Sequence, residues 1–393
     1  MVPTARRLRR DSAGLYTASF LFSLSLAMAG VAFPLLAAEA GYRPAEIGAL
    51  VAVSALAQIA MRWLLADVMR RVSNTTVVTA AALSLGVSNA LLAASAALVP
   101  MLIASLVQGT ARACFWTGSQ THIVRRGGRP APGIARLNLV ASVGMMAGPL
   151  TGGVLADESV HMALGVAAVI GFAGCIPTFL MVRPPPFAAG QTMNRRGFMR
   201  RRGVAMGVSA NAIAGAWRGI VGSYVPVALE AAGRSGATIG AVVAAANTAS
   251  VAGSFVSARV SGPRTRAALL WCGALTAATT GVVGYGWLPV LVTAASLSVG
   301  GLASGVLQVL GIAAAAQGVA DDERGDAVAV TGTLRAVALF ASPMGAAALL
   351  PVIGMGSAVL VMSLLMFVPV ALIRRDAGVP VVVREVGLGE PAQ

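Results

Sequence analysis

The sequence predicts an all-α integral membrane protein with about twelve transmembrane helices. Of its 393 residues, 57% are hydrophobic and only 11% are charged, whereas soluble domains carry about 25% charged residues. Apolar stretches recur along nearly the whole chain, and each approaches the roughly 20 residues that a helix needs to cross the hydrocarbon core. Because these stretches are continuous rather than alternating, they favour helices over the strands of a membrane barrel.

The apolar stretches predict the helices in order, separated by short polar or Pro/Gly segments. Their expected ranges are 14–38, 46–66, 75–98, 101–124, 134–156, 159–182, 204–230, 237–258, 267–287, 290–316, 326–350 and 353–373. The first run is longer than the roughly 7–15 residues of a signal-peptide core, so we expect it to be retained. Cys114, Cys175 and Cys272 fall within predicted helices without disulfide or metal-site spacing, and we expect neither a metal nor a cofactor.

The positive charges are concentrated in alternate connections between the predicted helices. All 29 basic residues are arginine, and the net charge is +15. Most of them lie at 6–10, 70–71, 125–129, 195–202, 259–266 and 374–375, while the intervening connections hold only Arg43 and Arg234. Cytoplasmic loops of membrane proteins carry such an excess, so both termini are expected in the cytoplasm and the helix count is expected to be even. We therefore expect the positive charge to set the topology and to contact anionic lipid headgroups rather than nucleic acid. The expected location is the inner (plasma) membrane, which the chain would cross many times.

The chain also repeats itself at an offset of 192 residues. Residues 47–52 read IGALVA and residues 239–244 read IGAVVA, while Gly41 and Gly233 close the preceding helices at the same offset. Six helices per repeat give both halves the same orientation, related by an axis along the membrane normal. The expected organisation is an N-terminal six-helix bundle at 1–182, a basic cytoplasmic linker at 183–203, a C-terminal six-helix bundle at 204–375 and a cytoplasmic tail at 376–393.

A cytoplasmic loop after the second predicted helix resembles a motif of the major facilitator superfamily. Residues 65–71 read LADVMRR, a partial match that keeps the family's Leu-Ala-Asp and one of its basic residues but lacks its glycines. The resemblance implies that Asp67 lies at a helix end near the N-terminal dipole of a neighbouring helix. Arg71 is the expected local counter-ion.

The fifth predicted helix carries a second and closer resemblance. Residues 144–153 read GMMAGPLTGG, which is similar to the antiporter motif of the same family and comprises Gly144, Gly148, Pro149, Gly152 and Gly153. Glycines four apart allow close helix contact, and the proline bends the helix. We therefore expect a kinked helix that packs tightly against the other half. In the family this motif marks exporters that exchange substrate for protons; generic small-residue packing is the alternative.

Polar residues inside apolar helices are candidates for function, because a charge near the bilayer centre costs about 3 kcal/mol. Arg112, Arg218 and Arg335 lie within predicted helices, whereas no Asp or Glu lies in the middle of one. The resemblance implies that helices one, four, seven and ten line a substrate cavity. Structural bonds are the alternative role of these arginines, and His122 and His161 are expected to be surface or packing residues. The cavity candidates are Gln108, Arg112, Asn211, Trp217, Arg218, Asn247, Gln308 and Arg335.

These features predict a secondary transporter that works by alternating access, most simply a proton-coupled exporter of a small organic molecule. The alternative is a carrier of an organic anion, because buried arginines without buried carboxylates suit a negative substrate. A non-transporting membrane sensor is a remote alternative. No zinc-hydrolase, nucleophile-elbow or phosphate-loop motif is present, so we expect no enzyme. The expected partners are the substrate, protons and the lipid bilayer, with the protein itself a monomer.

Overall fold

The computed structural model describes residues 5–125, 130–186, 201–260, 264–285, 288–319 and 324–375, and all regular structure within them is helical. The N-terminal half contains α1 (Ala5–Glu39), α2 (Pro44–Arg71), α3 (Asn74–Ala94), α4 (Leu98–Arg125), α5 (Pro130–Glu158) and α6 (Val160–Ala173). The C-terminal half contains α7 (Arg202–Ala231), α8 (Gly236–Val256), α9 (Arg264–Thr280), α10 (Val290–Gln317), α11 (Arg324–Leu365) and α12 (Phe367–Arg375).

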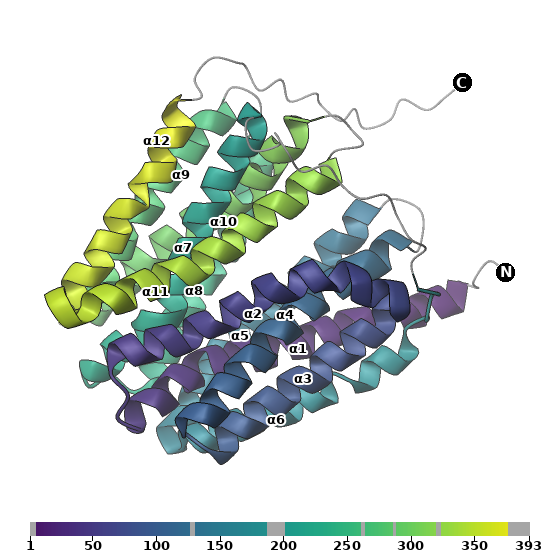
Figure 1. Ribbon diagram of the computed structural model, residues 1–393, viewed down its shortest axis with the longest axis horizontal. Coiled ribbons are helices and arrows are strands. Elements are labelled where there is room, and N and C mark those ends of the chain that lie inside the picture. Colours follow the sequence, from purple (N-terminus) through teal and green to yellow (C-terminus); the bar gives the residue numbers. More distant parts are fainter. Residues whose placement is uncertain are drawn as a thin grey trace.

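Within the described residues, eleven segments are long and apolar enough to cross a membrane. The last of them, Ala327–Arg374, has 48 residues, more than twice the length that one crossing needs. Gly354 breaks its helical backbone with φ 73° and ψ 169°. Figure 1 shows that α11 turns sharply before it continues into α12, so this segment runs across the molecule and back. The predicted all-helical fold with about twelve crossings is therefore confirmed, and the end of α11 together with α12 forms the final crossing.

Helix ends differ from the predictions where backbone geometry, rather than hydropathy, decides them. The predicted helix at 159–182 is interrupted, because α6 gives way to a 3-10 helix at Ile176–Leu180. Pro177 lies in that turn and has no backbone N–H to continue an α-helix. The predicted helix at 267–287 likewise tightens into a 3-10 helix at Gly281–Gly284, and its last two residues lie outside the described residues.

The backbone repeats the internal symmetry of the sequence at the ends of α1 and α7. Gly41 and Gly233 follow these two helices and both have positive φ, 82° and 71°. Glycine adopts this conformation without the steric cost that a side chain brings. The chain then reverses into α2 and α8, and the Ser235 hydroxyl caps α8 by accepting a hydrogen bond from the Thr238 N–H at 3.2 Å.

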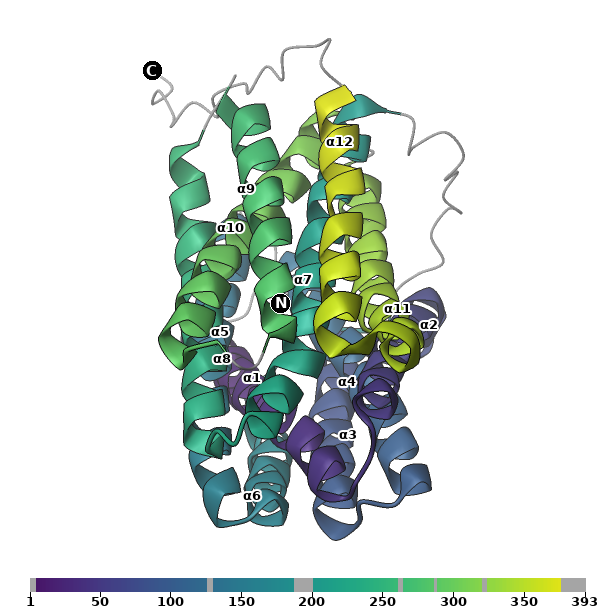
Figure 2. The same cartoon turned by 90° about the vertical axis from the view of Figure 1, so that its left-hand side faces the viewer.

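Two helices form the centre of the molecule. Within their most apolar windows, α1 is 78% buried and α7 is 83% buried, whereas the other spans are between 28% and 50% buried. α1 packs against α5, α6, α3 and α2 of its own half and against α7, and Figure 2 shows α9 and α12 in front of α7. Outward apolar side chains such as Trp271 and Leu291 are 77% and 83% exposed, as lipid-facing residues are.

The two halves meet along two seams, α5 against α8 and α2 against α11. Polar groups on α1, α7 and these four helices are therefore positioned to face one another between the halves. The bounds of the two bundles and of the linker stay predictions. Residues 187–200 of that linker and the predicted tail at 376–393 lie outside the described residues.

Candidate substrate cavity

A cavity of about 120 Å³ lies between the two halves and is lined by α1, α2, α4, α5, α7, α8 and α11. It has room for a small organic molecule rather than for a single water. The side chains of its wall are mostly apolar, and those with a polar or charged group are Ser54, Gln108, Arg112, Trp217, Arg218 and Asn247.

Glycines on the two central helices leave this space open. Gly30 on α1 and Gly222 on α7 both line the cavity. A Cβ atom built on either glycine would meet no heavy atom within 4 Å. Because these residues are 192 apart in the sequence, the internal repeat places one small residue on each side of the space. The cavity is therefore a product of the repeat as well as of the packing between the halves.

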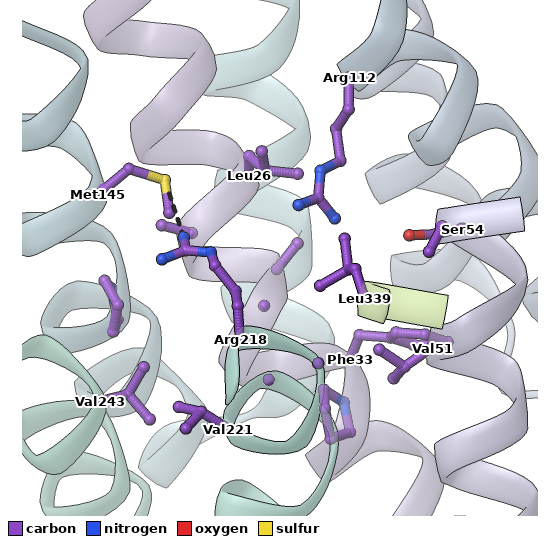
Figure 3. A pocket seen from close by; sticks show the side chains of 18 of the residues that line it. Leu26, Phe33, Val51, Ser54, Arg112, Met145, Arg218, Val221, Val243 and Leu339 are labelled. Atoms are coloured by element: carbon purple, nitrogen blue, oxygen red, sulfur yellow. Dashed lines mark hydrogen bonds between the residues drawn. The ribbon is translucent and has the colours of Figure 1, made fainter. Parts of the chain in front are cut away.

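Two arginines reach into the cavity from opposite halves, as Figure 3 shows. Arg218 on α7 donates from Nη1 to Oδ1 of Asn247 at 3.1 Å, and Asn247 in turn donates from Nδ2 to the carbonyl of Met145 at 3.2 Å. These contacts join α7, α8 and α5. Arg112 on α4 is half-buried and makes no hydrogen bond or ion pair with any described residue. The guanidinium of Arg218 is therefore held in place, and that of Arg112 is available to a ligand.

Further positive charge lies close to the cavity. Arg62 on α2 donates to the carbonyl of Gly332 on α11 at 2.8 Å, which ties the two halves together. Arg62 and Arg335 are near enough to Arg112 for their charges to interact. None of the lining residues is an aspartate or a glutamate. The described surroundings of the cavity are therefore positive, and little within them compensates that charge.

Five of the eight cavity candidates from the sequence line this space: Gln108, Arg112, Trp217, Arg218 and Asn247. The other three do not. Asn211 is buried and donates within α7 to the carbonyl of Gly207 at 3.1 Å. Arg335 lies one turn before Leu339, which does line the cavity, and its backbone packs closely against α7. Gln308 lies on α10, and no residue of that helix lines the space.

The expectation that the tenth helix lines the cavity is therefore wrong for this cavity. Trp217 fills the gap between α7 and α10, because a Cβ atom at Gly301 would lie 3.4 Å from its indole ring. The wall is completed instead by α2, α5, α8 and α11, which supply Ser54, Met145, Val243 and Leu339. In the sequence these four residues gave no signal for this role, since ordinary apolar and small residues occur throughout a membrane helix.

A buried acid was also missed, because it precedes the apolar run of the first helix. Asp11 is 1% exposed; its Oδ1 lies 2.9 Å from Nε2 of His122 and accepts a hydrogen bond from the Val182 N–H at 2.8 Å. Nδ1 of His122 lies 2.8 Å from the amide of Asn74. His122 is thus part of a buried polar cluster rather than a surface residue. The cluster does not line the cavity.

The glycine motif of α5 packs in two directions, which differs from the expected contact with the other half alone. Gly144, Gly148 and Gly152 face α1 of the same half, and a Cβ atom at Gly148 would lie 2.5 Å from that of Ala27. Gly153 faces the other half, against the backbone of α8. Successive faces of one helix point in different directions, so residues 152 and 153 contact different neighbours.

The ion pair in the cytoplasmic-loop motif also differs from the expected one. Asp67 pairs with Arg70 at 3.0 Å, not with the expected Arg71, and both side chains of the pair are exposed. Residues three and four apart on a helix are both neighbours, so spacing alone does not choose between Arg70 and Arg71. The role of Asp67 at the end of a neighbouring helix stays a prediction.

The described fold, a twelve-crossing helical bundle with a central cavity between two halves, is that of a membrane transporter. The sequence profile of the Major Facilitator Superfamily matches residues 15–343. The chain belongs to this superfamily, and it is a multi-pass membrane transporter rather than an enzyme.

Solved transporter structures share the fold. A mutant of the nucleoside transporter NupG matches with a TM-score of 0.76 at 13% identity, over 93% of this chain and 100% of that chain. A bacterial homolog of the human lysosomal transporter Spinster, in an inward-facing and occupied conformation, matches with a TM-score of 0.75 at 13% identity, over 95% and 97%. A POT family transporter in complex with 5-aminolevulinic acid matches with a TM-score of 0.74 at 11% identity, over 94% and 97%. No curated protein matches the sequence significantly.

Proposed function

We propose that this transporter carries a small organic anion by alternating access. The observation that carries the proposal is Arg112, a half-buried cation that points into the cavity across from Arg218. Among the described residues it has no hydrogen-bond or ion-pair partner. An uncompensated charge inside a membrane protein is costly. A visiting anion would compensate it. A guanidinium also binds a carboxylate through two parallel hydrogen bonds, which gives such a site selectivity for planar anions.

The rest of the cavity supports an anion with a small apolar body. Apolar side chains such as Leu26, Phe33 and Val51 make up most of the wall on the N-terminal side. Ser54 on α2 and Gln108, one turn before Arg112 on α4, offer neutral polar groups on that side. A monocarboxylate with a short aliphatic or aromatic group would place its charge between the arginines and its apolar part against this wall.

The contacts between the halves support alternating access with one end shut. Where α5 ends and α8 begins, Gly153 and Gly240 bring the two backbones together. We place the arginine-rich ends in the cytoplasm, because of the alternating arginine pattern. The shut end is then extracytoplasmic.

Proton-driven efflux is the second candidate. It is favoured by the α5 motif, whose Gly153 and Pro149 lie in the seam with α8. A coupled proton needs a titratable group, and no carboxylate lines the cavity. The buried acid found elsewhere is Asp11, paired with His122. If protons are exchanged, a pH-sensitive dye inside proteoliposomes should report proton movement on substrate addition, and Asp11→Asn should abolish that signal while substrate binding persists.

The anion proposal is tested by flux in proteoliposomes with an imposed pH gradient. Benzoate and benzylamine form a matched pair that differs in charge, and tetraphenylphosphonium adds a lipophilic cation. We expect saturable, protein-dependent movement of benzoate or a related carboxylate, and none of the cations. Arg112→Gln should remove that flux, while Arg234→Gln, at an exposed arginine that does not line the cavity, should retain it. Saturable transport of either cation together with inert carboxylates would refute the anion proposal.

A further inference from the structure

A carboxylate at the end of α5 reaches across the seam to the start of α8. Oδ1 of Asp157 accepts a hydrogen bond from the Gly236 N–H, and Oδ2 accepts one from the Ala237 N–H at 2.9 Å. Asp157 belongs to the N-terminal half and the two donors to the C-terminal half. This contact therefore exists only while the halves are together at this end.

The donors are groups that α8 cannot satisfy by itself. The first N–H groups of a helix have no partner within the helix. Ser235 satisfies Thr238 within the same half, at 3.2 Å. Gly236 and Ala237 precede that residue, and their partner in this structure comes from the opposite half. A negative charge is also favoured at a helix N-terminus by the aligned peptide dipoles.

The surrounding backbone is shaped for this contact. A Cβ atom at Gly236 would lie 2.6 Å from the carbonyl oxygen of Gly153 and 2.9 Å from Oδ1 of Asp157. A Cβ atom at Gly240 would likewise collide with the carbonyl of Pro149. Side chains at these glycines would hold the two helices apart. The approach that brings Asp157 to its donors thus depends on glycine on both sides of the seam.

We propose that Asp157 is a positioning residue of the transport cycle, a latch that stabilises the state in which this end of the cavity is shut. The inference rests on the alternating access proposed above but not on the charge of the substrate. At the opposite end of the N-terminal half, Asp67 pairs within its own helix, with Arg70. Asp157, in contrast, bridges the two halves at the seam between α5 and α8.

The latch is tested by distances between spin labels, without any substrate. Cys114, Cys175 and Cys272 are first replaced by serine. One label pair, Ala40 with Ala231, reports on the shut end, and the other, Arg136 with Arg259, reports on the opposite ends of α5 and α8; all four positions are exposed. The variants are Asp157→Ala, Asp157→Asn and Asp157→Glu, with Glu158→Ala as the matched control, since it removes the same charge one residue away.

We expect Asp157→Ala to shift the equilibrium away from the shut state by roughly fivefold to tenfold, the effect of losing a helix cap. The Ala40–Ala231 distances should lengthen while the Arg136–Arg259 distances shorten. Asp157→Asn keeps one acceptor and should fall between, Asp157→Glu should restore the wild-type distribution, and Glu158→Ala should leave it unchanged. Unaltered distances in Asp157→Ala and Asp157→Asn, or an equal shift in Glu158→Ala, would overturn the proposal. A lowered melting temperature without a shift in either distance would overturn it too. Because no substrate is present, failure of the anion proposal leaves this result unaffected.

Discussion

At the scale of single residues, the two cavity arginines differ in how they are held. Arg218 is fixed by Asn247, while Arg112 has no described partner. A side chain that is already bonded positions a substrate, whereas a free guanidinium supplies new bonds to it. Both roles depend on the planar fork of arginine, because lysine offers the same charge from a single point.

We therefore predict that Arg112→Lys and Arg218→Lys each reduce transport of a carboxylate at least about tenfold, the loss of one charge-assisted hydrogen bond. Arg335→Lys should have a milder effect, since Arg335 does not line the cavity. Initial rates in proteoliposomes check this, with membrane insertion measured for each variant. Full-rate transport of a cationic substrate by both lysine variants would make the two arginines structural.

At the scale of helices, the α5 motif separates into a packing face and a seam. Gly148 contacts Ala27 inside the N-terminal half, and Gly153 contacts α8 of the other half. Substitutions at the two positions should therefore have different consequences, although both lie in one motif.

We predict that Gly148→Val lowers the stability of the protein by about 1–3 kcal/mol, because it overpacks a contact that persists through the cycle. Gly153→Val should instead leave the melting temperature in detergent nearly unchanged and hold the α5–α8 seam open. Thermal unfolding and the Ala40–Ala231 label distance measure the two effects separately. Equal losses of stability in both variants would show that the seam has no separate role.

Gly354 gives a second prediction for an element, the turn between the last two crossings. Its φ is 73°, and a Cβ atom there would meet nothing within 4 Å, so only the backbone conformation opposes a side chain. Gly354→Ala should destabilise the protein by about 1–2 kcal/mol. The matched control is Gly165→Ala in α6, also in open space but with helical backbone, which should stabilise slightly. Melting temperatures that move in the same direction would argue against a strained turn.

At the scale of the whole molecule, the arginine pattern assigns a side of the membrane to each end of the bundle. We predict that a single cysteine at Arg43 is labelled by an impermeant reagent added outside intact cells, while a single cysteine at Arg70 is not. Both residues are exposed and lie at opposite ends of α2. Lysed cells provide the control, in which both should react. Labelling of the Arg70 position alone in intact cells would invert the proposed topology.

The internal repeat was visible in the sequence, yet its consequences for the cavity were not. The offset between Gly30 and Gly222 can be counted from the residues, but only the fold shows that both face one open space. Asp11 was missed because hydropathy marks the apolar centre of a helix, whereas α1 continues through its basic start. Helical hydrogen bonds need no apolar side chains, so polar helix ends escape such a criterion.

The sequence by itself determined the fold class, the number of crossings and the arginine bias of alternate connections. These are local properties, because each crossing must be long and apolar enough for the bilayer whatever its neighbours are. Tertiary structure alone decided which polar residues meet. Arg218 reaches Asn247 beside Met145, and Asp157 reaches Gly236, through contacts between helices far apart in the chain. The rotation of each helix about its axis sets such contacts, and packing against the other helices fixes that rotation.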